Sequence, residues 1–201
     1  MRIASFALDM MSGCGEDEQT STVPDSDDWK DMQVIMHGVR VKDVDNMTLD
    51  DLLDLGFKKE IISSTLVNAN RLEAGDVSPI MLVAQDGSIG VYDVYVQNNS
   101  KVKKSVEKCD IIRIYIVNNP DQSSGAIKSA SDIYLANGVG LGMTMEEVEA
   151  IMGEPTKEKD LQGKDSNIHK VWKYKADDEK RQEISIMFGA DEKIAMIQLQ
   201  Y

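Results

Sequence analysis

One unit of sequence occurs twice in this 201-residue chain, and it constrains the fold more than any other feature. The first copy reads HGVRVKDVDNMTLDDLLDLGF (37–57) and the second reads NGVGLGMTMEEVEAIMGEP (137–155). In each copy a Met-Thr pair leads into acidic residues, an apolar helical stripe and a glycine. Strand-like segments follow each copy, so the sequence predicts an internal repeat of a helix followed by a sheet.

The Met-Thr pair predicts where each helix begins. The threonine is a typical N-cap, and the acid three residues later completes a capping box with it. A glycine then ends each helix, and in the second copy a proline follows that glycine. The predicted capping residues, which we interpret as structural, are Thr48, Asp51, Thr144, Glu147, Gly153 and Pro155.

Segments of alternating apolar and polar residues follow both helices and predict antiparallel strands. Residues 79–98 read as a hairpin with Asp86-Gly87 near its turn, and residues 109–117 as a third strand. Residues 169–176, 183–190 and 193–201 read as a β-meander. We therefore predict an α+β fold of two tandem units, each with short helices packed on an antiparallel sheet. Trp172 and Tyr174 share one strand face, which is either core, as the apolar neighbours favour, or an exposed partner contact.

The N-terminus predicts where the protein resides. Residues 1–14 resemble a degenerate bacterial lipoprotein signal in which Met-Ser-Gly-Cys is the lipobox and Cys14 the lipidated residue. Asp9 interrupts a short apolar region, so a disordered N-terminus with a chance Ser-Gly-Cys is the alternative. Residues 15–31 are acidic and polar, as in a flexible tether. The predicted organisation continues with repeat unit 1 at 32–119, a linker at 120–132 and repeat unit 2 at 133–201.

The second repeat unit resembles a known lipoprotein family. Gly142-Met143-Thr144, Glu146-Glu147-Val148, Gly153-Glu154-Pro155 and Trp172-Lys173-Tyr174 carry the resemblance. This pattern is similar to the SmpA/OmlA (BamE) type of small lipoprotein domain, whose fold is similar to that of β-lactamase inhibitory protein. The first half matches weakly and resembles lipoproteins of Gram-positive bacteria. The resemblance implies extracytoplasmic protein–protein contact.

Several kinds of chemistry find no support in the sequence. The net charge of −13 argues against binding to nucleic acid or to anionic membranes. The glycines around Gly140 lack the spacing of a dinucleotide fingerprint or a P-loop, and the acids that follow would repel an anion. No ligand spacing surrounds His37 or His169, and Cys109 opens an apolar run as a small buried residue does. We therefore expect no catalytic residue, cofactor or metal.

These observations predict a non-catalytic extracytoplasmic lipoprotein, anchored to the cell membrane through Cys14. It would act as a protein-binding or scaffold module for an envelope protein that the sequence does not identify. A cell-wall-associated hydrolase or ligand carrier, and an inhibitor of a secreted enzyme, are the alternatives.

Overall fold

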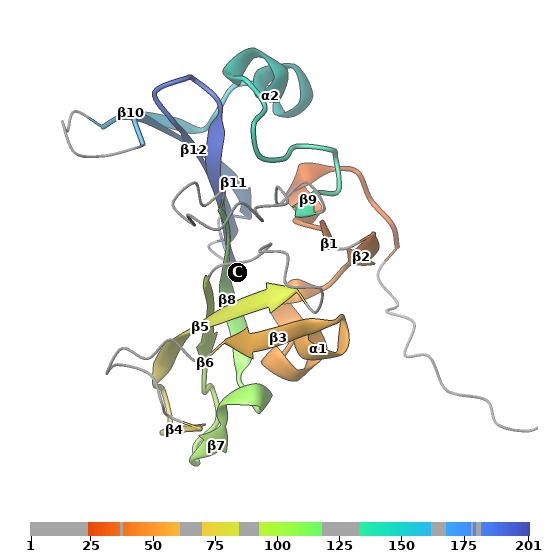
Figure 1. Ribbon diagram of the computed structural model, residues 1–201, viewed down its shortest axis with the longest axis vertical. Coiled ribbons are helices and arrows are strands. Elements are labelled where there is room, and N and C mark those ends of the chain that lie inside the picture. The colour runs from red at the N-terminus through yellow and green to blue at the C-terminus, as the bar shows by residue number, and fades with distance from the viewer. Residues whose placement is uncertain are drawn as a thin grey trace, which may run out of the picture.

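The computed structural model in Figure 1 describes most of the chain beyond the N-terminal region. The described residues are 24–36, 38–60, 70–84, 93–117, 133–161, 168–177, 179 and 182–201. Cys14, His37 and the predicted Asp86-Gly87 turn lie outside these residues.

Within the described ranges the chain forms short helices and mostly short strands. The helices are η1 (Trp29–Asp31), η2 (Val44–Asn46), α1 (Leu49–Asp54), η3 (Val106–Lys108) and α2 (Met145–Met152), where η marks a 3-10 helix. The strands of the first half are β1 (Val34–Met36), β2 (Val39–Val41), β3 (Phe57–Glu60), β4 (Arg71–Leu72), β5 (Val77–Ala84), β6 (Asp93–Gln97), β7 (Lys104–Ser105) and β8 (Asp110–Val117). Those of the second half are β9 (Ile133–Leu135), β10 (Lys157–Asp160), β11 (Lys170–Asp177), β12 (Gln182–Phe188) and β13 (Ile194–Gln200).

One eight-stranded antiparallel sheet dominates the fold. Its strand order is β10-β11-β12-β13-β8-β6-β5-β3, so the strands after α2 and those after α1 meet where β13 pairs with β8. Figure 1 shows this large sheet running along the long axis of the molecule. A second sheet has the order β2-β1-β9, and β4 pairs with β7 in a two-stranded ribbon.

The predicted α+β class of two tandem helix-plus-sheet units is wrong. Strands make up 48% of the residues that the structure describes, and the α-helices α1 and α2 have only six and eight residues. The sheet is also continuous, because β8 and β13 pair from Met196 opposite Val117 to Gln200 opposite Arg113. Left apart, each of these strands would have an edge of unpaired backbone groups, and their pairing removes both edges.

The apolar core lies on one face of the large sheet. Buried side chains from its central strands, such as Val94, Ile114, Ile186 and Leu199, belong to a single hydrophobic cluster with Leu52 of α1 and Val148 of α2. The β2-β1-β9 sheet contributes Val34, Met36, Ile133 and Leu135 to the same cluster. Figure 1 shows α1, this small sheet and α2 on the same side of the large sheet.

Part of the range predicted as a flexible tether packs on this core. The Trp29 ring of η1 lies edge-on to Tyr174 of β11, with centroids 5.5 Å apart. Asp27 pairs with Arg40 of β2 at 2.9 Å, and Lys42 pairs with Asp25. Asp25 and Asp27, two of the acids in this range, therefore form ion pairs with Lys42 and Arg40.

Candidate functional site

The predicted capping residues lie at the two α-helices. In α1 the Asp51 carboxylate accepts hydrogen bonds from the Thr48 backbone N–H and from the Thr48 hydroxyl, both at 2.7 Å. In α2 the Thr144 N–H donates to Glu147 at 2.8 Å, and the Glu147 N–H donates to the Thr144 hydroxyl oxygen at 3.3 Å. In both helices the acid three residues after the threonine thus binds the N-cap backbone N–H, which is the contact of a capping box.

The end of α2 and the glycine-rich loop before it also have structural roles. Gly153 is the C-cap of α2 at φ 77°, and Pro155 follows two residues later. Gly138 and Gly142 have φ values of 94° and 83°, a left-handed conformation that favours glycine. Their N–H groups donate to the backbone carbonyls of Leu135 and Ile194, so this loop directs neither group toward a phosphate.

Trp172 and Tyr174 are core residues rather than an exposed contact patch. Trp172 is 5% exposed and lies edge-on to Phe188, with ring centroids 5.0 Å apart. Tyr174 is fully buried and donates a hydrogen bond to the Gly153 carbonyl at 3.2 Å. Burial raises the pKa of Tyr174 to about 12. Neither side chain is available to a partner protein.

The opposite face of the large sheet, which we call the open face, carries a different set of side chains. Cross-strand partners in a sheet project from the same face, so the strand register defines rows across it. The first row is Lys159, Val171, Met187, Met196 and Val117. The second row is Lys157, Lys173, Ser185, Gln198 and Tyr115. The third row is Lys175, Glu183, Gln200, Arg113 and Tyr95.

A β-bulge lies next to Arg113 on β8. Tyr95 of β6 lies opposite Arg113, but the next residue of β6, Val96, lies opposite Ile111, so β8 has one extra residue at Ile112. In a regular strand Ile111 and Ile114 would face opposite sides, but the extra residue lets both face the core while Arg113 faces the open side. Bulges re-aim side chains in this way and are frequent beside functional sites.

Arg113 is the centre of an arginine–tyrosine cluster, made of Tyr95, Arg113, Tyr115 and Gln200. The guanidinium carbon lies 5.3 Å from the Tyr95 ring centroid and 6.0 Å from that of Tyr115. The two rings are 5.7 Å apart. Arg113 donates to the Tyr115 hydroxyl and to Gln200 Oε1, each at a long 3.3 Å.

This cluster leaves hydrogen-bonding capacity unused. A guanidinium has five N–H donors, and Nε of Arg113 is buried with no hydrogen-bond partner among the described residues. Unsatisfied buried donors are rare in folded proteins and call for an explanation. The cluster therefore combines an incompletely satisfied cation with two aromatic rings, the composition that is enriched at the energetic centres of protein interfaces.

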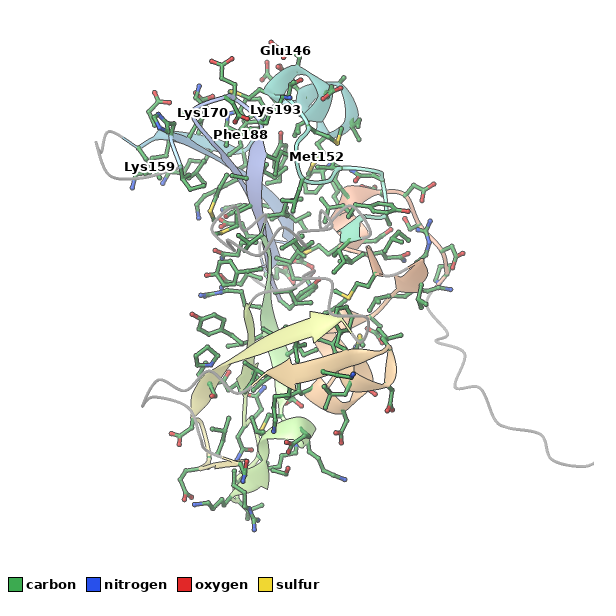
Figure 2. The ribbon with its side chains drawn as sticks, in the orientation of Figure 1. Glu146, Met152, Lys159, Lys170, Phe188 and Lys193 are labelled. Atoms are coloured by element: carbon green, nitrogen blue, oxygen red, sulfur yellow. The ribbon has the colours of Figure 1, made fainter. Side chains whose placement is uncertain are left out.

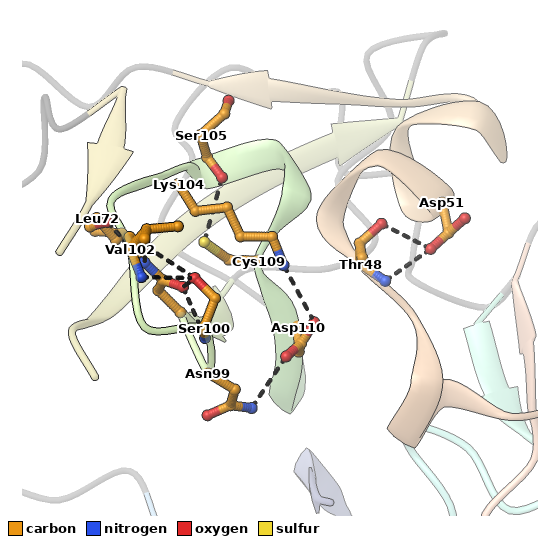
Figure 3. Close-up of polar contacts among 11 residues, drawn as sticks. Thr48, Asp51, Leu72, Asn99, Ser100, Val102, Lys104, Ser105, Cys109 and Asp110 are labelled. Atoms are coloured by element: carbon orange, nitrogen blue, oxygen red, sulfur yellow. Dashed lines mark hydrogen bonds and ion pairs between the residues drawn. The ribbon is translucent and has the colours of Figure 1, made fainter. Parts of the chain in front are cut away.

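A second polar cluster, which includes Leu72, Val102, Ser105 and Cys109, has a structural role (Figure 3). Asn98 is fully buried and donates to the carbonyls of Leu72 and Val102, both at 2.8 Å. Cys109 is free and fully buried, and its thiol donates to the Ser105 carbonyl at 3.3 Å. Burial raises the pKa of this thiol, so it is protonated and a poor nucleophile.

Glu107, next to that cluster, forms an ion pair with Lys59 of β3. Burial alone would raise the pKa of the Glu107 carboxyl, but hydrogen bonds from Lys59 and from the Ser105 hydroxyl hold it at about 2. The pair ties η3 to the outermost strand of the sheet. Its low pKa thus reflects a structural contact rather than a poised acid or base.

The described residues include no group of three or more His, Cys, Asp or Glu side chains that could hold a metal ion. His169 is exposed at the start of β11. No helix in the described ranges is both long and apolar enough to cross a membrane.

Comparison of the chain with protein-family models, with curated proteins and with solved structures finds no match. Function must therefore be inferred from the open face itself. Sequence analysis overlooked Arg113 and Tyr115, although their alternation with Ile114 and Ile116 places them on the face opposite those isoleucines.

Proposed function

We propose that the protein is a protein-binding module of the cell envelope that contacts its partner through the open face. The arginine–tyrosine cluster is the observation that carries this proposal. Its buried, unpaired Arg113 Nε and two aromatic rings lie in the interior of the sheet, on β6 and β8. Arginine and tyrosine in such central positions contribute a large share of binding free energy at known interfaces.

The dimensions of the open face suit a protein partner. Eight strands spaced about 4.8 Å apart are roughly 38 Å wide, and six residues of strand are roughly 20 Å long. The resulting area of roughly 760 Å² is close to the about 800 Å² that each partner contributes to a standard interface. The first row adds apolar contacts, because Val171, Met187, Met196 and Val117 lie side by side across four strands.

The proposal includes an anchor. Lipidation at Cys14 would hold the module at the membrane, with the chain between Cys14 and Trp29 joining the lipid to the core on which Trp29 packs. A Cys14→Ser variant expressed in a Gram-positive host should then leave the membrane fraction and fail to incorporate an alkyne-labelled fatty acid. Unchanged labelling would disprove the anchor while leaving the binding function untouched.

The binding function is tested by photo-crosslinking in intact cells. A benzophenone amino acid at Gln198, which lies next to Tyr115 in the second row, should form an adduct with an envelope protein. The same probe at Val102, which is 69% exposed and lies outside the large sheet, is the control and should not. The adduct should fall at least tenfold when Arg113→Ala and Tyr115→Ala are added. Equal adducts at both positions, or an adduct that survives the double substitution, would remove the support for this site.

A further inference from the structure

The edge strand β10 separates its charges onto two faces. Its four residues alternate in sign, and all are exposed. Glu158 and Asp160 project to the same side as Lys170, which pairs with them at 2.7 Å and 3.6 Å. Glu158 also accepts a hydrogen bond from the Trp172 indole at 3.1 Å. The two acids are therefore engaged within the fold.

The lysines of β10 project to the open face and lack such compensation. Neither Lys157 nor Lys159 forms an ion pair with any residue that the structure describes. The register places Lys157 directly opposite Lys173 of β11, and Lys175 lies two residues further along the same strand face. These four residues, Lys157, Lys159, Lys173 and Lys175, form what we call the lysine strip. Figure 2 shows Lys159 at the end of the large sheet that carries α2, with Lys170 nearby.

The pairing of Lys157 with Lys173 within the lysine strip is unfavourable for the isolated protein, whereas Lys175 lies opposite Glu183. Like charges opposite one another on neighbouring strands destabilise a sheet. Glu183 offsets part of this repulsion, since its carboxylate lies 2.6 Å from the Lys173 ammonium. The chain has 35 acids against 22 basic residues, so its composition alone would favour acidic neighbours for every lysine. A row of lysines on one face of so acidic a protein indicates an anionic partner.

We propose that the lysine strip binds an extended acidic segment of the partner protein. The inference rests on the protein-binding function proposed for the open face, and it adds the chemistry of the ligand. Residues two apart in a strand repeat about every 6.6 Å, so Lys159, Lys157 and Lys175 span a strip roughly 13 Å long. Acids at positions i, i+2 and i+4 of an extended segment match that spacing. The apolar row beside the strip then accepts apolar side chains that follow.

The overall charge of −13 does not prevent this binding. At physiological ionic strength the Debye length is about 8 Å, so a bound segment experiences mainly the lysines of the strip and the neighbouring Glu158, Asp160 and Glu183, rather than the acids elsewhere in the chain. A lipid surface fits the open face less well. An amphipathic surface that binds a membrane buries its apolar side chains about 5–10 Å into the headgroup region. Met187 and Met196 are instead half-buried between neighbouring strands of the sheet.

Fluorescence anisotropy with synthetic peptides tests the ligand chemistry. The probe is a labelled Glu-Val-Glu-Val-Glu-Val-Val peptide, and the comparison peptide carries lysine in place of each glutamate. The full-length protein should bind the acidic peptide only, and raising NaCl from 50 to 500 mM should weaken binding at least fivefold. A Lys157→Glu, Lys159→Glu variant should bind at least tenfold more weakly than the wild type.

A matched variant, Lys101→Glu with Lys108→Glu, changes net charge by the same amount at two exposed lysines outside the large sheet. It should bind within twofold of the wild type, and equal losses in both variants would overturn the inference. Binding to vesicles containing 30% phosphatidylglycerol but not to the peptide would also overturn it, in favour of a lipid surface. If neither ligand binds while the Gln198 adduct in cells still depends on Arg113, the inference fails and the proposed function stands. Loss of that dependence would refute the proposed function itself.

Discussion

Replacing Arg113 with methionine separates a binding role from a structural one. Methionine has a similar length and places a polarizable sulfur between the same two rings. It removes two hydrogen bonds of 3.3 Å to Tyr115 and Gln200, each worth about 0.5 kcal/mol at that length. It also removes two cation–π contacts, each worth about 0.5–1 kcal/mol. The expected loss is about 2–3 kcal/mol.

The gains are of similar size. Removing the buried, unpaired Nε eliminates a desolvation cost of about 1–3 kcal/mol. Sulfur–aromatic contacts with Tyr95 and Tyr115 add about 0.3–1.5 kcal/mol each. Tyr115 and Gln200 are only half-buried, so water can replace the donors they lose. We therefore expect the free energy of unfolding of Arg113→Met to fall no more than about 1.5 kcal/mol below the wild-type value.

Urea unfolding of the full chain, read by intrinsic fluorescence, measures that difference, and the Gln198 photo-adduct measures binding in parallel. The expected result is near-wild-type stability with loss of the adduct. An Arg71→Met variant is the control, because exposed Arg71 lies on β4 outside the large sheet and should leave both readouts unchanged. Destabilisation by more than about 3 kcal/mol, the size expected when a buried charge pair is broken, would refute the reasoning and make Arg113 a structural residue.

Two further predictions concern stability. Asn98→Ala should lower the free energy of unfolding by about 2–4 kcal/mol, because it removes the buried bonds to the Leu72 and Val102 carbonyls. The neighbouring Asn99→Ala, at an exposed site, should cost less than about 1 kcal/mol in the same urea titration. Glu107 has a pKa of about 2 in the folded protein against 4.5 for the free group, so its stabilisation is complete above pH 4.5 and is lost as the pH falls toward 2. The pair with Lys59 is partly exposed, so we expect this loss to be about 1–2 kcal/mol, and Glu107→Gln should flatten the acid side of the stability–pH curve by that amount. An unchanged slope in Glu107→Gln would mean that the pair contributes nothing.

Local patterns in the sequence determined the secondary structure of several segments. The Met-Thr pairs lie where α1 and α2 begin, because capping depends on residues only three apart. Alternation in residues 169–201 gave the meander β11-β12-β13, and it put Trp172 and Tyr174 on the side that proved to be buried. Such signals are local in sequence, so they survive whatever tertiary arrangement surrounds them.

Only the tertiary structure decided how the segments assemble. The pairing of β8 with β13 joins residues 79 to 87 positions apart, and no local pattern encodes it. That pairing merged the two expected sheets into one and made the tandem α+β prediction wrong. The bulge at Ile112 likewise depends on the register with β6, and it puts Ile111 on the same core face as Ile114. Sequence alone therefore determined the starts of the two α-helices and the strands of the meander with their buried side. Long-range strand register determined the single sheet and its open face, because backbone pairing between distant strands is fixed by the assembled core.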